Sequence, residues 1–119
     1  MNEIWLLRGI RIAGWACIVV IAVLSLLPAE EMVRTSLGGL IEHALAYAGT
    51  TLLLGLSYRR PFRISAAMVA YAAVLEPLQA LSPGRNPAVA DWAASSVGAL
   101  IGAACVTFIL QQITPQPQS

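Results

Sequence analysis

The chain contains no lysine and few charged residues of any kind. Of its 119 residues only 11% are charged, against about 25% in an average soluble domain. All seven basic residues are arginines, and together with six acidic residues they leave a formal net charge of +1. The near-neutral charge and the absence of an extended basic run argue against a nucleic-acid partner.

Cysteine and histidine are also scarce. Cys17 and Cys105 lie in apolar stretches far apart in the chain, and His43 is the only histidine. We therefore expect the cysteines to act as small apolar side chains rather than as a disulfide or a metal-binding pair. A single histidine with carboxylates makes a poor zinc ligand set, so no metal and no other cofactor is predicted.

Hydrophobic residues, in contrast, are abundant. They make up 58% of the chain, and the mean hydropathy is +0.74. A soluble domain of this size could not bury so much apolar surface, because small domains keep a large exposed fraction. The composition therefore predicts an integral membrane protein. Four helices of ~20 residues would need ~80 residues, so the chain is long enough for four spans and hardly more.

Four apolar stretches are long enough, or nearly so, to cross a bilayer as helices. The first stretch is long enough to cross the bilayer only if its helix begins before Arg11, whose side chain can reach the interface. The fold predicted is an all-α membrane protein with four transmembrane helices in one domain, residues 1–113, and a disordered tail, residues 114–119. The stretches are roughly Ile12 to Leu27, Gly39 to Ser57, Phe62 to Leu81, and Ala90 to Ile113.

The N-terminal stretch has some features of a secretory signal peptide. Arg8 and Arg11 precede an apolar run, but the run is longer than usual and ends at Pro28 without a small-residue cleavage site. We expect this segment to be retained as a membrane anchor.

The arginines predict an orientation. Five of them precede the first span or lie between the second and third spans, and two lie in the other connections. The positive-inside rule therefore places both termini in the cytoplasm. Short connections favour an antiparallel, up-and-down bundle. The larger group consists of Arg8, Arg11, Arg59, Arg60 and Arg63, and the smaller of Arg34 and Arg85.

Small residues line one face of the fourth span. Ala94, Gly98 and Gly102 recur at a spacing of four, and the two glycines form a GxxxG motif. Such a stripe lets another helix approach closely. The motif is compatible with packing inside the bundle and with a homodimer through Gly98 and Gly102, and the sequence leaves both open.

Polar residues gather at the outward ends of the last three spans. An ionisable side chain facing lipid there costs roughly 2.5–3.5 kcal/mol or more, so we expect these residues to turn inward to a shared site. Taken singly, His43 and Tyr47 could be interfacial residues and Asp91 a helix cap, and the group could be only a structural hydrogen-bond network. The set is His43, Tyr47, Glu76, Gln79, Arg85, Asp91 and Ser95.

The same residues, in this order, resemble the VanZ-like family of small bacterial membrane proteins. The matching segments run from His43 to Tyr47, from Glu76 to Gln79, from Pro83 to Arg85 and from Asp91 to Gly98. Ser95 stands where the family has Asn, and Gly39 and Leu40 stand where it often has an Asp-Lys pair. The resemblance implies a multi-pass protein of the bacterial inner (cytoplasmic) membrane, in a family associated with teicoplanin resistance.

Three functions fit these observations. In the first, an outward pocket binds the headgroup of an envelope lipid or glycan, such as a lipid-linked precursor. Arg85 would bind an anion, and Tyr47, Gln79, Asp91 and Ser95 would contact the ligand. In the second, the protein is a hydrolase or transferase with His43 as general base and Glu76 as its acid–base partner. In the third, the polar residues only hold the helices together.

Overall fold

The computed structural model describes residues 3–27, 38–84 and 88–113. These residues form four α-helices and one short 3-10 helix, with no strand among them, and each α-helix is long and apolar enough to span a membrane. The all-α fold with four candidate membrane spans is therefore confirmed. The elements are α1 (Glu3–Leu26), α2 (Gly39–Tyr58), α3 (Pro61–Leu78), η2 (Gln79–Leu81) and α4 (Val89–Ile113).

The helix boundaries follow local sequence signals. Helix α1 begins at Glu3, well before Arg11, and so reaches the length that the apolar run alone lacks. Helix α2 ends at Tyr58, and the next residue, Arg59, adopts the left-handed conformation and donates its backbone N–H to Gly55 O. Pro61 then opens α3, where its missing N–H has no helical partner to lose. The predicted tail, residues 114–119, lies outside the described residues.

Hydrogen bonds show how α1 lies against its neighbours. Arg11 donates from its guanidinium to Ser57 O over 3.0 Å, and the Trp15 indole donates to the Tyr58 hydroxyl, also over 3.0 Å. At its other end α1 receives a hydrogen bond from the Ser82 hydroxyl at Leu26 O. The start of α1 therefore lies beside the end of α2. The end of α1 lies beside Ser82, the residue that follows η2.

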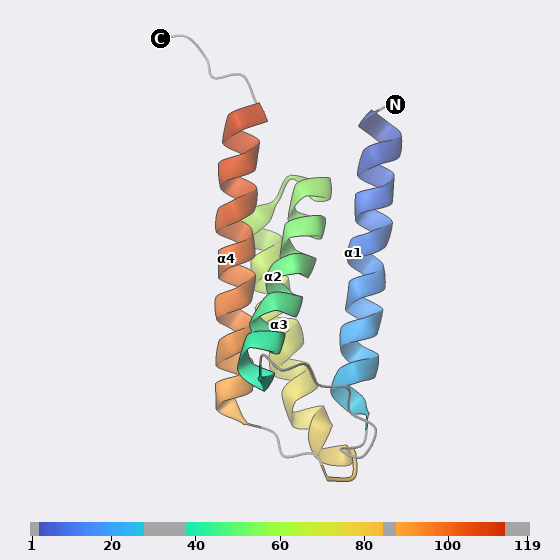
Figure 1. Ribbon diagram of the computed structural model, residues 1–119, viewed down its shortest axis with the longest axis vertical. Coiled ribbons are helices and arrows are strands. Elements are labelled where there is room, and N and C mark those ends of the chain that lie inside the picture. The colour runs from blue at the N-terminus through green and yellow to red at the C-terminus, as the bar shows by residue number, and fades with distance from the viewer. Residues whose placement is uncertain (1–2, 28–37, 85–87, 114–119) are drawn as a thin grey trace.

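The two ends of the bundle differ in charge. Figure 1 shows the first turn of α1, the α2–α3 junction and the last turns of α4 in the upper part of the molecule, and the ends of α1 and η2 and the start of α4 in the lower part. We call the upper part the arginine end, because it carries Arg8, Arg11, Arg59, Arg60 and Arg63. We call the lower part the carboxylate end, for Glu76 and Asp91.

The most extensive contact between helices joins α2 to α4, which are not consecutive in the chain. Gly98 and Gly102 are buried at this contact. A Cβ atom at Gly98 would overlap the Ala44 carbonyl, and one at Gly102 would lie 2.6 Å from Ala48 O. The small-residue stripe thus packs inside the bundle. A homodimer through these two glycines stays a prediction, and it would require α2 to leave this face.

The interior is small and the outer surface is apolar. The core cluster combines Tyr47, Met68 and Leu75 with smaller side chains, whereas α1 buries only Gly14 and Ile21. Trp5, Ile12 and Val19 of α1 are more than half exposed. Such a surface suits a lipid environment, in which the helices associate through close packing and hydrogen bonds rather than through exclusion of water.

Candidate functional site

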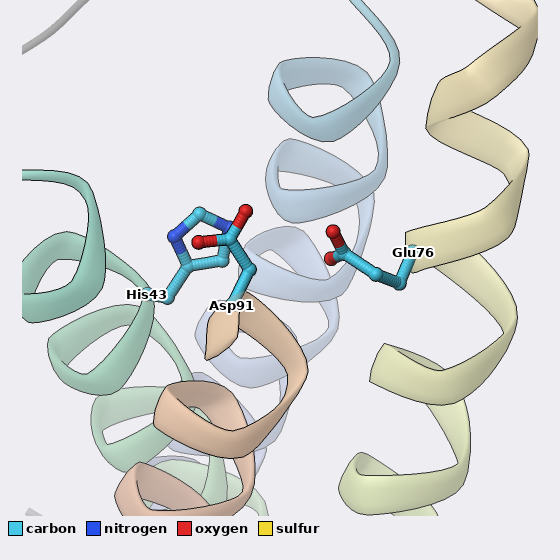
Figure 2. Close-up of side chains that lie close together, drawn as sticks. All are labelled: His43, Glu76 and Asp91. Atoms are coloured by element: carbon cyan, nitrogen blue, oxygen red, sulfur yellow. The ribbon is translucent and has the colours of Figure 1, made fainter. Parts of the chain in front are cut away.

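Three ionisable side chains from three helices meet at the carboxylate end. His43 of α2, Glu76 of α3 and Asp91 of α4 each offer one oxygen or nitrogen atom, and these three atoms lie within 4.8 Å of one another. Figure 2 shows the Glu76 carboxylate pointing toward Asp91 and the His43 ring. The structure therefore brings together three residues that are 33 and 15 positions apart in sequence.

His43 is oriented by its own helix. Its Nδ1 lies 2.7 Å from Gly39 O, one turn earlier in α2. A carbonyl oxygen can only accept a hydrogen bond, so Nδ1 is the protonated nitrogen. In the neutral ring, Nε2 then carries the free lone pair and can accept a proton or coordinate a metal.

Glu76 is more than nine-tenths buried, with 8% of its surface exposed. Its Oε1 accepts a hydrogen bond of 2.7 Å from the backbone N–H of Ala88, immediately before α4. The first N–H groups of a helix lack helical partners, and its dipole favours a negative charge there. Glu76 thus caps α4 from a different helix, which fixes its position and offsets part of the cost of burying it.

Asp91 occupies the first turn of α4. The helix dipole favours a carboxylate at this position, as the capping interpretation of Asp91 requires. In Figure 2 its carboxylate also lies beside the His43 ring. The position of Asp91 therefore serves both the helix terminus and the cluster, and α4 brings two carboxylates close together at its N-terminal end.

The cluster holds more negative than positive charge. Two carboxylates lie within 4.8 Å of one imidazole, and two negative charges at this distance repel each other. A cation, or a ligand that donates hydrogen bonds, would stabilise the pair. Arg85, the predicted anion-binding residue, lies outside the described residues.

The remaining predicted residues surround the cluster without joining it. Tyr47 is buried one turn from His43 and packs against Tyr71, with ring centroids 6.4 Å apart. Gln79 is buried in η2, and Ser95 is buried one turn beyond Asp91. These three residues lie close to the cluster along their own elements, but none belongs to the set of converging ligand atoms.

An open groove of about 340 Å³ lies between α3 and the start of α4, and Glu76 forms part of its lining. Apart from Glu76 its lining is apolar, and the Trp92 indole, which forms one wall, donates to Val69 O over 3.2 Å. The sequence gave no signal for this groove. The lining residues are Ala73, Glu76, Pro77, Ala88, Val89 and Trp92.

By helix length and composition, the chain is a multi-pass helical membrane protein with a polar cluster at one end. No family model, curated protein or solved structure matches the chain.

Proposed function

We propose that this protein lies in the inner (cytoplasmic) membrane of a bacterium and binds the polar headgroup of an envelope lipid or glycan at its carboxylate end. The four helices would span the membrane as an antiparallel bundle, with both termini and the arginine end in the cytoplasm. The five arginines at one end support this orientation. The carboxylate end then faces outward.

The observation that carries the proposal is that Glu76 belongs both to the polar cluster and to the apolar groove. A ligand that fits both is amphiphilic, with a polar group at the cluster and a hydrocarbon chain along the groove. The groove volume of about 340 Å³ lies within the range of ~300–1,000 Å³ that is typical of ligand sites. An envelope lipid has this chemistry.

The charge of the cluster narrows the choice of headgroup. Two carboxylates accept hydrogen bonds, so they favour a ligand that presents hydroxyl or amine groups, as glycans do. A phosphate would be repelled unless a cation lay between it and the carboxylates. The resemblance to the VanZ-like family also supports an envelope ligand, because His43, Glu76 and Asp91 all belong to the matching segments.

Native mass spectrometry of the protein extracted in a mild detergent tests the proposal. We expect a co-purifying lipid with a hydroxyl-rich or amine-bearing headgroup. Ala73→Phe should displace it by filling the groove, and Glu76→Gln should weaken its retention. Ala66→Phe is the matched control, because Ala66 is also exposed on α3 but lies outside the groove. Equal lipid retention in all four proteins would contradict the proposal.

A membrane hydrolase or transferase is the second candidate function. It is favoured by His43, whose Nδ1 is held by a carbonyl, so that Nε2 is left to accept a proton as a general base would. Turnover of a defined lipid-linked substrate by the purified protein, lost in both His43→Ala and Glu76→Gln, would establish it. A rate unchanged in both variants would exclude it.

A further inference from the structure

We propose that His43, Glu76 and Asp91 form a binding site for one divalent transition-metal ion, of the Zn²⁺ or Mn²⁺ type. The ligands would be Nε2 of His43 and one oxygen from each carboxylate. The inference rests on the placement of these three side chains and does not require a lipid ligand. It revises the expectation of no metal, which was based on the number of ligands without their arrangement.

The distances allow a common ion. The three ligand atoms lie within 4.8 Å of one another. Ligand atoms around one tetrahedral ion lie roughly 3.4 Å apart, given metal–ligand distances of ~2.1 Å. Small side-chain rotations can close this difference, and Asp91 has room for one because it is only partly buried.

The surroundings of two ligands also fit a metal site. A metal-bound histidine usually donates its other ring N–H to a carbonyl or carboxylate, which fixes the tautomer and the ring orientation. His43 does so through Nδ1 to Gly39 O. Glu76 is held in the same way by the Ala88 N–H at Oε1, which leaves Oε2 for the ion. Both ligands are thus oriented by backbone groups outside the cluster.

Burial supplies an independent reason for a cation. Glu76 is more than nine-tenths buried, and its carboxylate points toward Asp91, a second carboxylate (Figure 2). A buried charge without compensation is costly, so such groups are normally paired, protonated or bound to a metal. One divalent ion would neutralise both carboxylates while His43 stays neutral.

The donor set indicates the kind of ion. One imidazole and two carboxylates, without a thiolate, suit Zn²⁺ or Mn²⁺ better than a soft ion such as Cu⁺, and the nitrogen ligand disfavours Mg²⁺ and Ca²⁺. Three protein ligands leave at least one coordination position open to water or to an exogenous ligand. Because Glu76 also lines the groove, a headgroup held there could occupy this position.

Metal binding can be measured directly on the purified, detergent-solubilised protein. The chain should carry Cys17→Ser and Cys105→Ser, because both cysteines are free thiols that bind Zn²⁺, and no histidine tag. After treatment with a chelator, titration with Zn²⁺ should give one equivalent per chain. Mn²⁺ should bind more weakly than Zn²⁺, as the Irving–Williams order requires, and Mg²⁺ weakest.

The variants assign the site. Asp91→Asn and His43→Ala should each weaken Zn²⁺ binding by more than ~100-fold, because removing a ligand costs more than the 10- to 100-fold typical of outer-shell partners. Glu3→Gln is the matched control, since Glu3 is an acidic residue at the opposite end of the bundle. Circular dichroism should show the same helix content in all variants. Because Asn has nearly the shape of Asp, Asp91→Asn keeps the test interpretable if His43→Ala does not fold.

Two results would overturn the metal site. The first is a folded protein that binds less than 0.1 equivalent of Zn²⁺ at ~100 μM free ion, which corresponds to a Kd of about 1 mM or weaker. The second is Zn²⁺ binding that Asp91→Asn and His43→Ala leave unchanged. Either result leaves lipid retention in the Ala73→Phe experiment unaffected. Conversely, stoichiometric Zn²⁺ binding without a co-purifying lipid would support the metal site and count against the lipid. The two proposals therefore fail separately.

Discussion

The arginine end and the carboxylate end use charge in different ways. At the arginine end, Arg11 lies over the Tyr58 ring, 4.0 Å from its centroid, and also donates to Ser57 O. Its charge stays near the surface and is satisfied by an aromatic face and a helix terminus. At the carboxylate end, Glu76 is buried and directed toward another carboxylate. The first arrangement satisfies a charge within a helix pair, whereas the second brings two carboxylates together beside one imidazole.

The first prediction is which side of the membrane each end of the bundle faces, and the expected effect is all-or-none. In a chain with Cys17→Ser and Cys105→Ser, Leu81→Cys should react with a membrane-impermeant maleimide on intact cells, because Leu81 is 81% exposed at the carboxylate end. Phe62→Cys, 66% exposed at the arginine end, should react only after permeabilisation. The opposite labelling pattern would reverse the orientation and with it the outward site.

The second prediction compares the glycines that pack α2 against α4 near each end. Gly98→Ala should destabilise the fold by ~3 kcal/mol, the upper part of the usual range for overpacking, because its methyl group would overlap the Ala44 backbone beside His43. Gly55→Ala should change stability by less than ~1 kcal/mol, since its Cβ would meet Val106 Cγ2 at 3.0 Å and Ala favours the helix. Thermal unfolding in detergent measures both.

Gly49→Ala serves as the control for helix propensity, because a Cβ at Gly49 meets nothing within 4 Å. It should raise stability slightly. Equal effects of Gly98→Ala and Gly49→Ala would show that α4 does not pack against Ala44, and the placement of Asp91 beside His43 would then lose its support.

Much of this arrangement could be predicted from sequence, because exposing charged or unpaired polar groups to lipid costs free energy. The apolar runs gave the four helices to within a few residues, except at α1, which begins at Glu3 rather than Ile12. The expense of lipid-facing charge indicated that His43, Glu76 and Asp91 turn inward. Whether these side chains meet depends on how three helices are placed relative to one another. The sequence pattern predicts only which face of each single helix they occupy.

Other features could be predicted from the sequence only in part or not at all. The stripe of Gly98 and Gly102 predicted a close helix partner but could not identify it as α2. The hydrogen bond from Ala88 to Glu76 is made by a backbone N–H, which every residue except proline carries. The groove is lined by Ala73 on α3 and Trp92 on α4, and such a gap depends on how the helices pack rather than on composition.

The third prediction removes the stabilising contact at the arginine end. Arg11→Ala loses the hydrogen bond to Ser57 O and the stacking on Tyr58, which together are worth ~1–2 kcal/mol at a partly exposed site. Thermal unfolding should therefore occur at a lower temperature, while Zn²⁺ and lipid binding stay unchanged. Arg8→Ala is the milder control, because the Arg8 guanidinium lies 5.4 Å from the Trp5 ring centroid, farther than Arg11 lies from Tyr58. Loss of binding in Arg11→Ala would show that the two ends are coupled.

Glu76→Gln should change stability less than Arg11→Ala, although Glu76 is far more buried than Arg11. Gln keeps an acceptor for the Ala88 N–H, so the substitution exchanges a charged hydrogen bond for a neutral one, a difference of ~1 kcal/mol. Removing one of two neighbouring carboxylates relieves repulsion and offsets part of that loss. Thermal unfolding without added metal should therefore shift little, while Zn²⁺ affinity falls sharply. A large drop in stability with ligand binding intact would instead mean that Glu76 serves only to hold α3 against α4. Substitution of a residue that only packs lowers stability, whereas substitution of a residue that binds lowers the affinity for the ligand.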